Sequence, residues 1–299
     1  MLRALFMEHC DGPEALVRFQ SSFGFETCAK EEFECVVGEW GVDKETWTLV
    51  KDAVPTVASK NGAGVRDART LSEVLKSAEV EKATLAPEEV VALRLLTGPM
   101  REVYNLSLRG SGAGAKDGGS SGNDLRFATT CLLISSGLRK LARVGGALKG
   151  DAVYRGLGGG DEQFAAGLLE KDGTGFSSVL YESFLSVTED RAEAERHAVR
   201  AGLEQGDDTG DADDMQTILE IKVGKTSMGA NVGWVAQFPG EGGIVYPPRT
   251  HLEVVGAPRV EGGVRVVTLR ATVDQVFHRP SSKSFRSCKS FISSPLWTR

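Results

Sequence analysis

The chain has 299 residues, of which 41% are hydrophobic, so it can bury a substantial core in one large domain or two small ones. Its net charge of −6 and its pI near 5.4 argue against nucleic acid as a main partner, because nucleic-acid-binding proteins need a basic surface. No run approaches the roughly 18 apolar residues of a membrane span, and the N-terminus lacks the features of a signal peptide. We therefore expect a cytoplasmic protein that does not enter a membrane.

Cysteine usage supports the same location. The five cysteines are odd in number, widely scattered and without a Cys-x-x-Cys pair, which favours reduced thiols in an intracellular protein. The four histidines do not lie at ligand spacing with them, so we expect no metal site.

The N-terminal part of the chain reads as mostly helical. Residues 1–80 are weakly periodic, and we expect a small helical lead-in, of unassigned role, that packs on the next part of the chain. A helix is predicted from Ala86, because Pro87 suits a first turn and acidic residues come after it. The residues at 97–99, Thr-Gly-Pro, interrupt this helix, and Tyr104–Arg109 resume it.

A low-complexity Gly/Ser segment at 110–122 is typical of a flexible linker. Asn123 is a candidate cap for the next helix. That helix carries an apolar stripe with helical spacing, formed by Phe127, Cys131, Ile134, Leu138 and Leu141. We interpret the stripe as a core-facing surface.

Beyond residue 150 the apolar pattern changes to a period of two. Strands are predicted at 217–223, 251–256 and 264–270, with a charged helix at 191–201 between strands. Helices followed by a β-rich half indicate an α+β fold. The six acids within 204–214 lack the ligand order of a calcium loop and predict a surface loop, and the basic, Ser-rich tail from His278 predicts disorder.

Arg155 lies in an apolar-flanked strand, where a guanidinium needs a partner. Gly156 and the glycines at 158–160 come after it and allow close approach of a ligand to the backbone. A diphosphate would satisfy the arginine bidentately, and an internal salt bridge is the alternative.

Ser186 and Thr188 are two residues apart and therefore share one face of a strand. Their hydroxyls are suited to hold a neighbouring side chain or a ribose, although an ordinary strand edge has the same pattern.

Glu241 comes after the loop at 236–240 and precedes a strand that ends at the prolines 247–248. A carboxylate at a strand start can stabilise positive charge that develops on a sugar during glycosidic cleavage. The alternative is a solvated turn residue.

Taken in order, these three segments resemble the arginine–serine–glutamate class of mono-ADP-ribosyltransferases. The surrounding sequence is similar to a branch of such proteins in microalgae and related protists. The segments that carry this resemblance lie between residue 86 and about residue 275, at 88–99 with 104–105, 153–156, 184–191, 234–239, 247–248 and 252–254.

The resemblance implies two small facing β-sheets around an NAD cleft, behind an N-terminal helical subdomain. It implies that Arg155 holds the diphosphate, that Gly156 offers backbone hydrogen bonds to nicotinamide, and that Ser186 and Thr188 belong to the NAD site. Phe238 would lie on a loop that meets an acceptor protein, and Glu241 would contact the acceptor arginine. The corresponding domain spans 81–277, between the lead-in at 1–80 and the tail at 278–299.

One position departs from the family pattern. Counting back from the prolines at 247–248, Gly243 occupies the place of the glutamate that supports the cationic transition state. Three interpretations are open. The protein is a transferase in which the Glu241 carboxylate reaches the ribose, a relative that binds NAD or a partner without turnover, or an unrelated α+β interaction protein. The choice between NAD and NADP stays open.

Overall fold

The computed structural model describes residues 1–38, 40–43, 45–51, 66–109, 126–145, 148, 150–157, 177–204, 216–224, 229–238 and 243–273. The chain forms two compact units, of which the first comprises residues 1–110, 122–146 and 229–245 and the second 111–121, 147–228 and 246–299. The linker at 110–122, the Asn123 cap, the acidic stretch after Glu204 and the tail from His278 fall outside the described residues.

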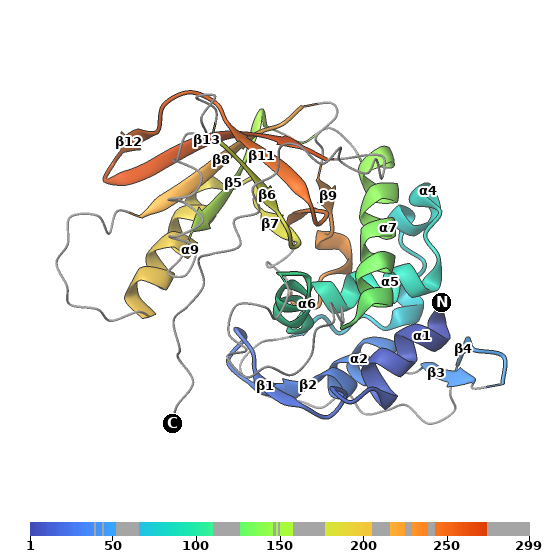
Figure 1. Ribbon diagram of the computed structural model, residues 1–299. Helices are drawn as coiled ribbons and strands as arrows, with labels where there is room; N and C mark the ends of the chain where they lie inside the picture. Colours follow the sequence, from blue (N-terminus) through green and yellow to red (C-terminus); the bar gives the residue numbers. More distant parts are fainter. Residues whose placement is uncertain are drawn as a thin grey trace, which may run out of the picture. The chain divides into compact units, whose positions relative to one another are not determined.

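The first unit is mainly helical and carries short strands (Figure 1). Its elements in chain order are α1 (Leu2–Phe6), the π-helix η1 (Met7–Asp11), β1 (Arg18–Gln20), β2 (Glu26–Cys28), α2 (Ala29–Val37), β3 (Trp40–Asp43), β4 (Thr48–Lys51), α3 (Leu71–Val74), α4 (Ala78–Ala83), α5 (Pro87–Leu96), α6 (Met100–Arg109), α7 (Ala128–Val144), β9 (Ala230–Asn231), the 3₁₀-helix η3 (Gly233–Val235) and the first two residues of β10 (Ile244–Tyr246).

Helix α5 forms the centre of this unit, and the predicted start at Pro87 is confirmed. Glu89 accepts a hydrogen bond from the Ala86 amide (2.8 Å) and so satisfies one free donor of the first turn. Every residue from Glu89 to Leu96 is buried, as expected for a helix surrounded by others. Helix α7 approaches closely at Gly137, where an added Cβ would lie 2.9 Å from a methyl carbon of Leu93.

The predicted stripe on α7 is confirmed, because all five of its residues are buried. The start of α7 is capped from a distance: the Glu8 carboxylate accepts hydrogen bonds from the amides of Thr129 (2.7 Å) and Thr130 (3.0 Å). A carboxylate at this end also complements the positive end of the helix dipole. The N-terminal segment therefore packs on a later part of the chain, as predicted.

The same segment is not purely helical, contrary to expectation. Strands β1 and β2 pair antiparallel, and β3 pairs with β4. The β1–β2 connection closes through a hydrogen bond from the Ser21 amide to the Phe25 carbonyl, with Gly24 at a φ of +83°. Only glycine adopts that φ readily, and a single turn residue of this kind gives no periodic signal in the sequence.

His9 is a buried polar residue at the base of this packing. Its Nδ1 lies 2.8 Å from the Leu5 carbonyl oxygen, and its Nε2 lies 2.7 Å from the Tyr104 hydroxyl. A neutral ring that donates from Nδ1 and accepts at Nε2 satisfies both contacts. Burial lowers the pKa of His9 to about 4, against the opposing effects of the Leu5 carbonyl and the Glu8 charge.

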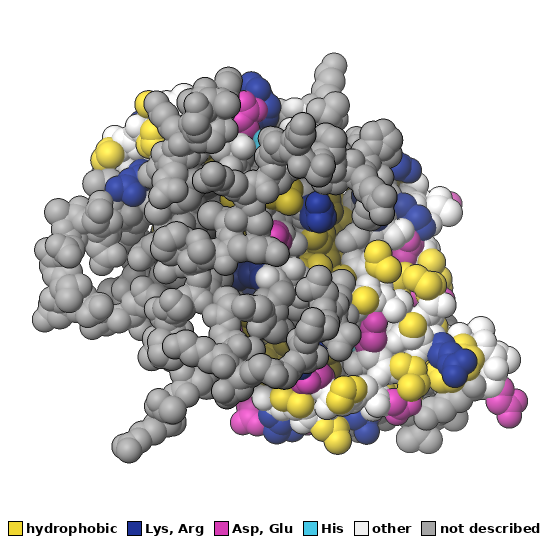
Figure 2. Space-filling model, in the orientation of Figure 1, with side chains coloured by type: hydrophobic (Ala, Val, Ile, Leu, Met, Phe, Trp, Pro, Cys, Tyr) yellow, Lys and Arg dark blue, Asp and Glu magenta, His cyan; other side chains and the backbone are white. Residues whose placement is uncertain are grey.

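On the face of the first unit drawn in Figure 2, hydrophobic side chains reach the surface over the N-terminal helices and the β3–β4 ribbon. Exposed apolar residues of these elements include Met7 and Val50. Scattered exposure of this kind is ordinary for a globular protein. Within the described part of the chain, no helix has both the length and the apolar character needed to cross a bilayer.

The second unit is built on one sheet. Its described elements are β5 (Ala152–Leu157), β6 (Ser178–Tyr181), β7 (Leu185–Val187), α9 (Arg191–Glu204), β8 (Thr217–Lys222), β11 (Thr250–Val254), β12 (Arg259–Glu261) and β13 (Val264–Thr272). The strand order is β5-β8-β13-β11-β6, with β12 beside β13. Only β8 and β13 pair in parallel among these described strands. The predicted α+β class, with several small sheets, is confirmed.

Helix α9 packs directly on strand β5, and Gly156 is the point of closest approach. A Cβ at this position would overlap the Ala194 carbonyl oxygen and lie 2.8 Å from the Ala198 amide nitrogen. Both partners are helix backbone, which cannot move aside as a flexible side chain would. The small residue therefore sets how closely the helix covers this face of the sheet.

We expect His9 to make stability depend on pH. Its folded pKa lies below the ordinary value of 6.5, so between pH 6.5 and 4 the unfolded chain takes up a proton that the native state refuses. Stability is therefore lost as the pH falls through this window, by about 2 kcal/mol between pH 7 and 5. Chemical denaturation of wild type and His9→Phe at both pH values measures this, and the variant should lack that part of the slope. Equal slopes for the two proteins would contradict the assignment, while Tyr104→Phe should keep the slope.

We expect Gly156→Ala to destabilise the second unit by about 1–3 kcal/mol or more, because the new methyl group meets helix backbone. Gly150→Ala is the matched control, since its Cβ would make only ordinary contacts of 3.6 and 3.9 Å with Ala152. Urea unfolding of both variants tests this. A Gly156→Ala protein as stable as the control would show that α9 is held less closely than described.

Candidate functional site

Arg155 lies on β5, with its side chain on the face opposite to α9. Gly156 faces the helix, and successive residues of a strand point to opposite sides. Val153 and Leu157, on the same face as Arg155, are buried, whereas Arg155 is half-buried. The strand thus places one cation on an otherwise apolar surface.

The chain path brings two further residues to Arg155. Strands β5 and β6 lie at opposite ends of the sheet order, but β7 begins only a few residues after β6 ends. Thr188, directly after β7, pairs with Tyr154 of β5 through two backbone hydrogen bonds of 2.7 and 2.8 Å. The segment from β6 to β7 therefore runs from one edge of the sheet back to the other.

The Arg155 guanidinium is oriented by this returning segment. Its Nη1 donates a hydrogen bond to the Ser186 carbonyl oxygen (3.2 Å), and its central carbon lies 5.8 Å from the centre of the Tyr181 ring. A planar guanidinium can lie over an aromatic ring, and its fork matches the oxygens of an anion in geometry. Two of the three predicted motif segments are thus in direct contact.

Ser186 and Thr188 have different surroundings. The Ser186 hydroxyl is half-buried and makes no hydrogen bond within the described part of the chain. The Thr188 hydroxyl donates to the Glu193 carboxylate (2.6 Å) and accepts from the Asp190 amide (3.1 Å). Thr188 therefore fixes the start of α9, whereas the Ser186 hydroxyl is the one with hydrogen-bonding capacity left.

The third segment belongs to the first unit. The Phe238 ring is only 4% exposed and stacks on Phe23, with ring centres 4.1 Å apart. Residues of the N-terminal segment provide the packing partners that bury this ring, and the contact of the Phe238 loop with an acceptor protein stays a prediction. Glu241 falls outside the described residues. Gly243 is described, and its carbonyl accepts a hydrogen bond from the Val232 amide (3.1 Å).

Sequence reasoning missed two residues of the second unit. Tyr181 gave no signal beyond being an aromatic at the end of a strand. Glu220 on β8 is an acid within an alternating strand pattern and gave no sign of burial in the sequence, yet it is buried between Arg259 and Thr268, which lie 3.1 and 2.9 Å from its carboxylate. Burial acts to raise the pKa of Glu220, but hydrogen bonds from these residues and from Lys222 outweigh it and hold the pKa below its usual value.

The residues suited to hold a ligand are therefore a cation and a hydroxyl. Arg155 offers a guanidinium fork to phosphate oxygens, and Ser186 offers a donor and acceptor to a sugar. Among the residues that the structure describes, no group of three or more His, Cys, Asp or Glu side chains is placed to hold a metal ion.

No protein-family model and no curated protein matches the chain. Among solved structures it is similar to ADP-ribosyltransferases. HopU1 of Pseudomonas syringae pv. tomato DC3000 is 18% identical, with 82% of this chain and 98% of that chain covered and a TM-score of 0.47. The Vis toxin from Vibrio splendidus is 15% identical over 70% of this chain and 89% of that chain (TM-score 0.42). Exoenzyme S from Pseudomonas aeruginosa, bound to Carba-NAD and in complex with human 14-3-3 protein beta, is 20% identical over 67% and 86% (TM-score 0.40).

Proposed function

We propose that the protein is an NAD-dependent mono-ADP-ribosyltransferase that acts on arginine side chains of an acceptor protein. The observation that supports this proposal most is the contact between Arg155 and Ser186. These residues are 31 positions apart in the sequence, and the fold of the second unit joins them through a hydrogen bond of 3.2 Å. The first two elements of the motif thus lie where one ligand can contact both.

In this proposal Arg155 binds the diphosphate of NAD. The Ser186 carbonyl and the Tyr181 ring hold the guanidinium in one orientation, so less side-chain entropy is lost when an anion binds. The hydroxyl of Ser186 binds the ribose next to nicotinamide, and Gly156 is the place at which nicotinamide approaches the backbone. Thr188 contributes indirectly, because its hydroxyl is used at the start of α9.

The reaction breaks the bond between the ribose C1′ and the nicotinamide nitrogen, and the electron pair leaves with nicotinamide. Positive charge develops on the sugar, which a nearby carboxylate stabilises. A guanidinium nitrogen of the acceptor then forms a bond to C1′ and releases a proton. We assign the carboxylate and the acceptor contact to Glu241, because Gly243 has no side chain to offer.

Gly243 also favours a second function, in which the protein binds NAD without turnover. Removal of one preorganised catalytic group costs on the order of 10²–10³ in rate. The two functions differ in one measurable property, since both require NAD binding through Arg155 and only the first requires release of nicotinamide.

We expect Arg155→Ala to weaken NAD binding at least about tenfold, because charge-assisted hydrogen bonds are lost from a partly buried site. Arg155→Lys should recover only part of the affinity, since lysine keeps the charge but not the fork. Arg270→Ala is the matched control, because that exposed arginine lies in the same sheet and pairs only with Glu253 among described residues. Titration calorimetry with NAD measures all three; unchanged affinity in Arg155→Ala would refute both functions.

We expect Gly243→Glu to raise nicotinamide release by about 10²-fold, since it returns a carboxylate to the position that the family pattern assigns to it. Gly243→Gln is the control for size without charge and should release nicotinamide at the wild-type rate. Release is followed with purified protein, NAD and an arginine analogue as acceptor. Wild-type and Gly243→Glu proteins that both bind NAD and both release nothing would exclude the transferase function.

A further inference from the structure

Arg191 opens helix α9 shortly after the segment that carries Ser186 and Thr188. Its guanidinium has two acidic partners. Nε lies 3.0 Å from Glu195 Oε1, one turn later in the same helix, and Nη2 lies 2.7 Å from Glu261 Oε2 of strand β12. The first pair is internal to the helix, so the contact with Glu261 is the one that ties the start of α9 to another element.

Glu261 is held from a second side. Its Oε1 accepts a hydrogen bond from Nε of Arg259 on the same strand, so one carboxylate joins two guanidinium groups. The hydrogen bonds from Arg259 and, to a smaller extent, from Arg191 hold the pKa of Glu261 below its usual value. The carboxylate therefore stays ionised at neutral pH and keeps both partners.

Arg259 leads from this carboxylate to a buried one. Its Nη2 lies 3.1 Å from Glu220 Oε2, and its Nη1 donates to the Thr268 hydroxyl (2.6 Å), which in turn donates to the same oxygen of Glu220 (2.9 Å). Glu220 is only 7% exposed, and a buried carboxylate needs a cation and hydrogen bonds in place of water. The position of Arg259 is therefore set by the interior of the sheet, and Glu261 binds a guanidinium that is already fixed.

The sheet order separates the two attachments of α9, which lies on one side of the sheet in Figure 1. Strands β8 and β13 lie between β5, which packs on the helix at Gly156, and β12, which carries Glu261. Thr188, which pairs with β5 through its backbone, donates from its hydroxyl to Glu193 in the first turn (2.6 Å). The first turn of α9 is thus attached to β5 through Thr188 and to β12 through Arg191.

We infer that Arg191 is a positioning residue for the nucleotide site and acts through the segment Ser186–Thr188. This inference rests on the proposed function, in which the Ser186 carbonyl orients Arg155 through a hydrogen bond of 3.2 Å. The segment leads into the first turn of α9, so its position depends on where that turn is held. A guanidinium that is oriented before the ligand arrives loses less side-chain entropy on binding and therefore binds more tightly. Arg191 touches no ligand in this scheme.

The exposure of the pair sets the size of the expected effect. The side chains of Arg191 and Glu261 are 35% and 39% exposed, and pairs of this kind contribute little to global stability. Loss of the pair should therefore leave the second unit folded and loosen only the start of α9. Arg191→Met keeps an unbranched side chain without its donors and charge, and Glu261→Ala removes the acceptor. Arg270→Met and Glu253→Ala are the matched controls, because these residues form an exposed pair within the same sheet that does not involve α9.

The first readout is amide hydrogen exchange, which needs no ligand. The amides of Thr188, Tyr154 and Ala194 are hydrogen-bonded in the native structure, the first two to each other's carbonyls. Both variants should raise exchange at these amides about three- to fivefold, while amides of β13 keep their protection as a check on folding. Unchanged exchange in either variant overturns the inference, whether or not the protein binds NAD.

The second readout is NAD affinity, measured by titration calorimetry. Both single variants should bind NAD about three- to fivefold more weakly, and the double variant no more weakly than either single one, because both changes remove the same pair. Glu261→Ala is the decisive variant. It removes a negative charge, so a long-range electrostatic effect would strengthen binding of the anionic ligand, whereas loss of positioning weakens it. Arg191→Lys keeps a charged contact and should recover part of the affinity.

The outcomes of the two readouts are separable. Wild-type NAD affinity in Glu261→Ala, together with raised exchange, overturns the role of Arg191 at the nucleotide site. Failure of the proposed function is a different result, because the wild-type protein itself would then bind no NAD.

Discussion

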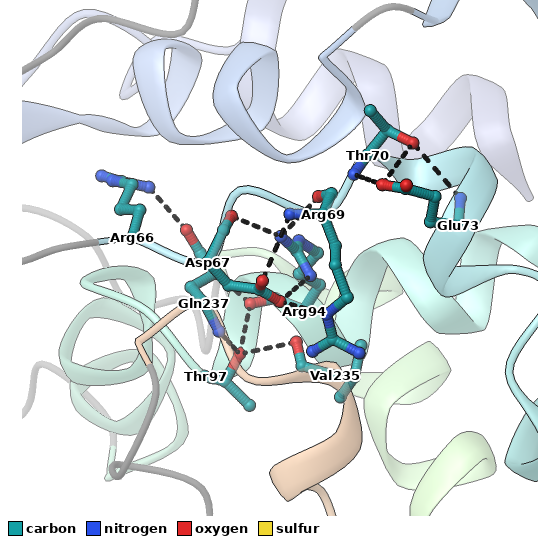
Figure 3. A network of polar contacts seen from close by, with 9 residues as sticks. All are labelled: Arg66, Asp67, Arg69, Thr70, Glu73, Arg94, Thr97, Val235 and Gln237. Atoms are coloured by element: carbon teal, nitrogen blue, oxygen red, sulfur yellow. Dashed lines mark hydrogen bonds and ion pairs between the residues drawn. The ribbon is translucent and has the colours of Figure 1, made fainter.

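A buried ion pair between Glu32 and Arg66 determines how the first unit is assembled. Glu32 is almost fully buried, and a carboxylate in that position is tolerated only if a cation and hydrogen bonds compensate for its lost hydration. Arg66 meets that requirement with two nitrogens and uses a remaining hydrogen-bonding direction for Gln237. The pair joins α2 to the segment that begins at Arg66, and through Gln237 to a segment 171 residues later (Figure 3). Removing either charge would leave the other one buried and unpaired, so these three parts of the chain keep their places together.

Strand β5 shows how one short stretch of sequence serves packing and chemistry at once. Its residues alternate between two faces, so Gly156 admits the backbone of α9 on one side while Arg155 extends from the other. The glycine sets the distance between α9 and β5. It therefore also sets how far the strand that carries the arginine lies from the helix. Thr188 strengthens the same arrangement, since its backbone pairs with Tyr154 and its hydroxyl holds the first turn of α9. The sequence suggests that this motif serves only to bind a ligand. The same residues also determine how α9 packs on β5.

The sequence was sufficient to predict those elements in which apolar side chains recur with a single helical or strand period. The stripe on α7, the first turn of α5 and the strands β8, β11 and β13 can be predicted from spacing alone. It was insufficient where burial depends on distant partners. Glu220 looks like an outward residue, and it is buried because the Arg259 side chain and the Thr268 hydroxyl meet it there. Phe238 is buried against Phe23 and Arg66, and its burial could not be predicted because these partners come from a segment with no readable period. Contact between Arg155 and Ser186 was predictable only as a consequence of a family resemblance, since neither residue reveals its partner through its neighbours.

In the proposed function, the residue at position 243 affects the turnover of NAD and not the binding of NAD. The contacts that orient Arg155 come from the Ser186 carbonyl and the Tyr181 ring, and neither involves a carboxylate of the third segment. The contacts that hold Val235–Phe238 come from Arg66, Asp67, Arg94 and Thr97, and none of them depends on the residue at 243. A change from glutamate to glycine at that position would thus remove a charge without removing any of the support around it. Such a loss lowers the rate of a step in which positive charge develops and leaves the affinity for an anionic ligand unchanged.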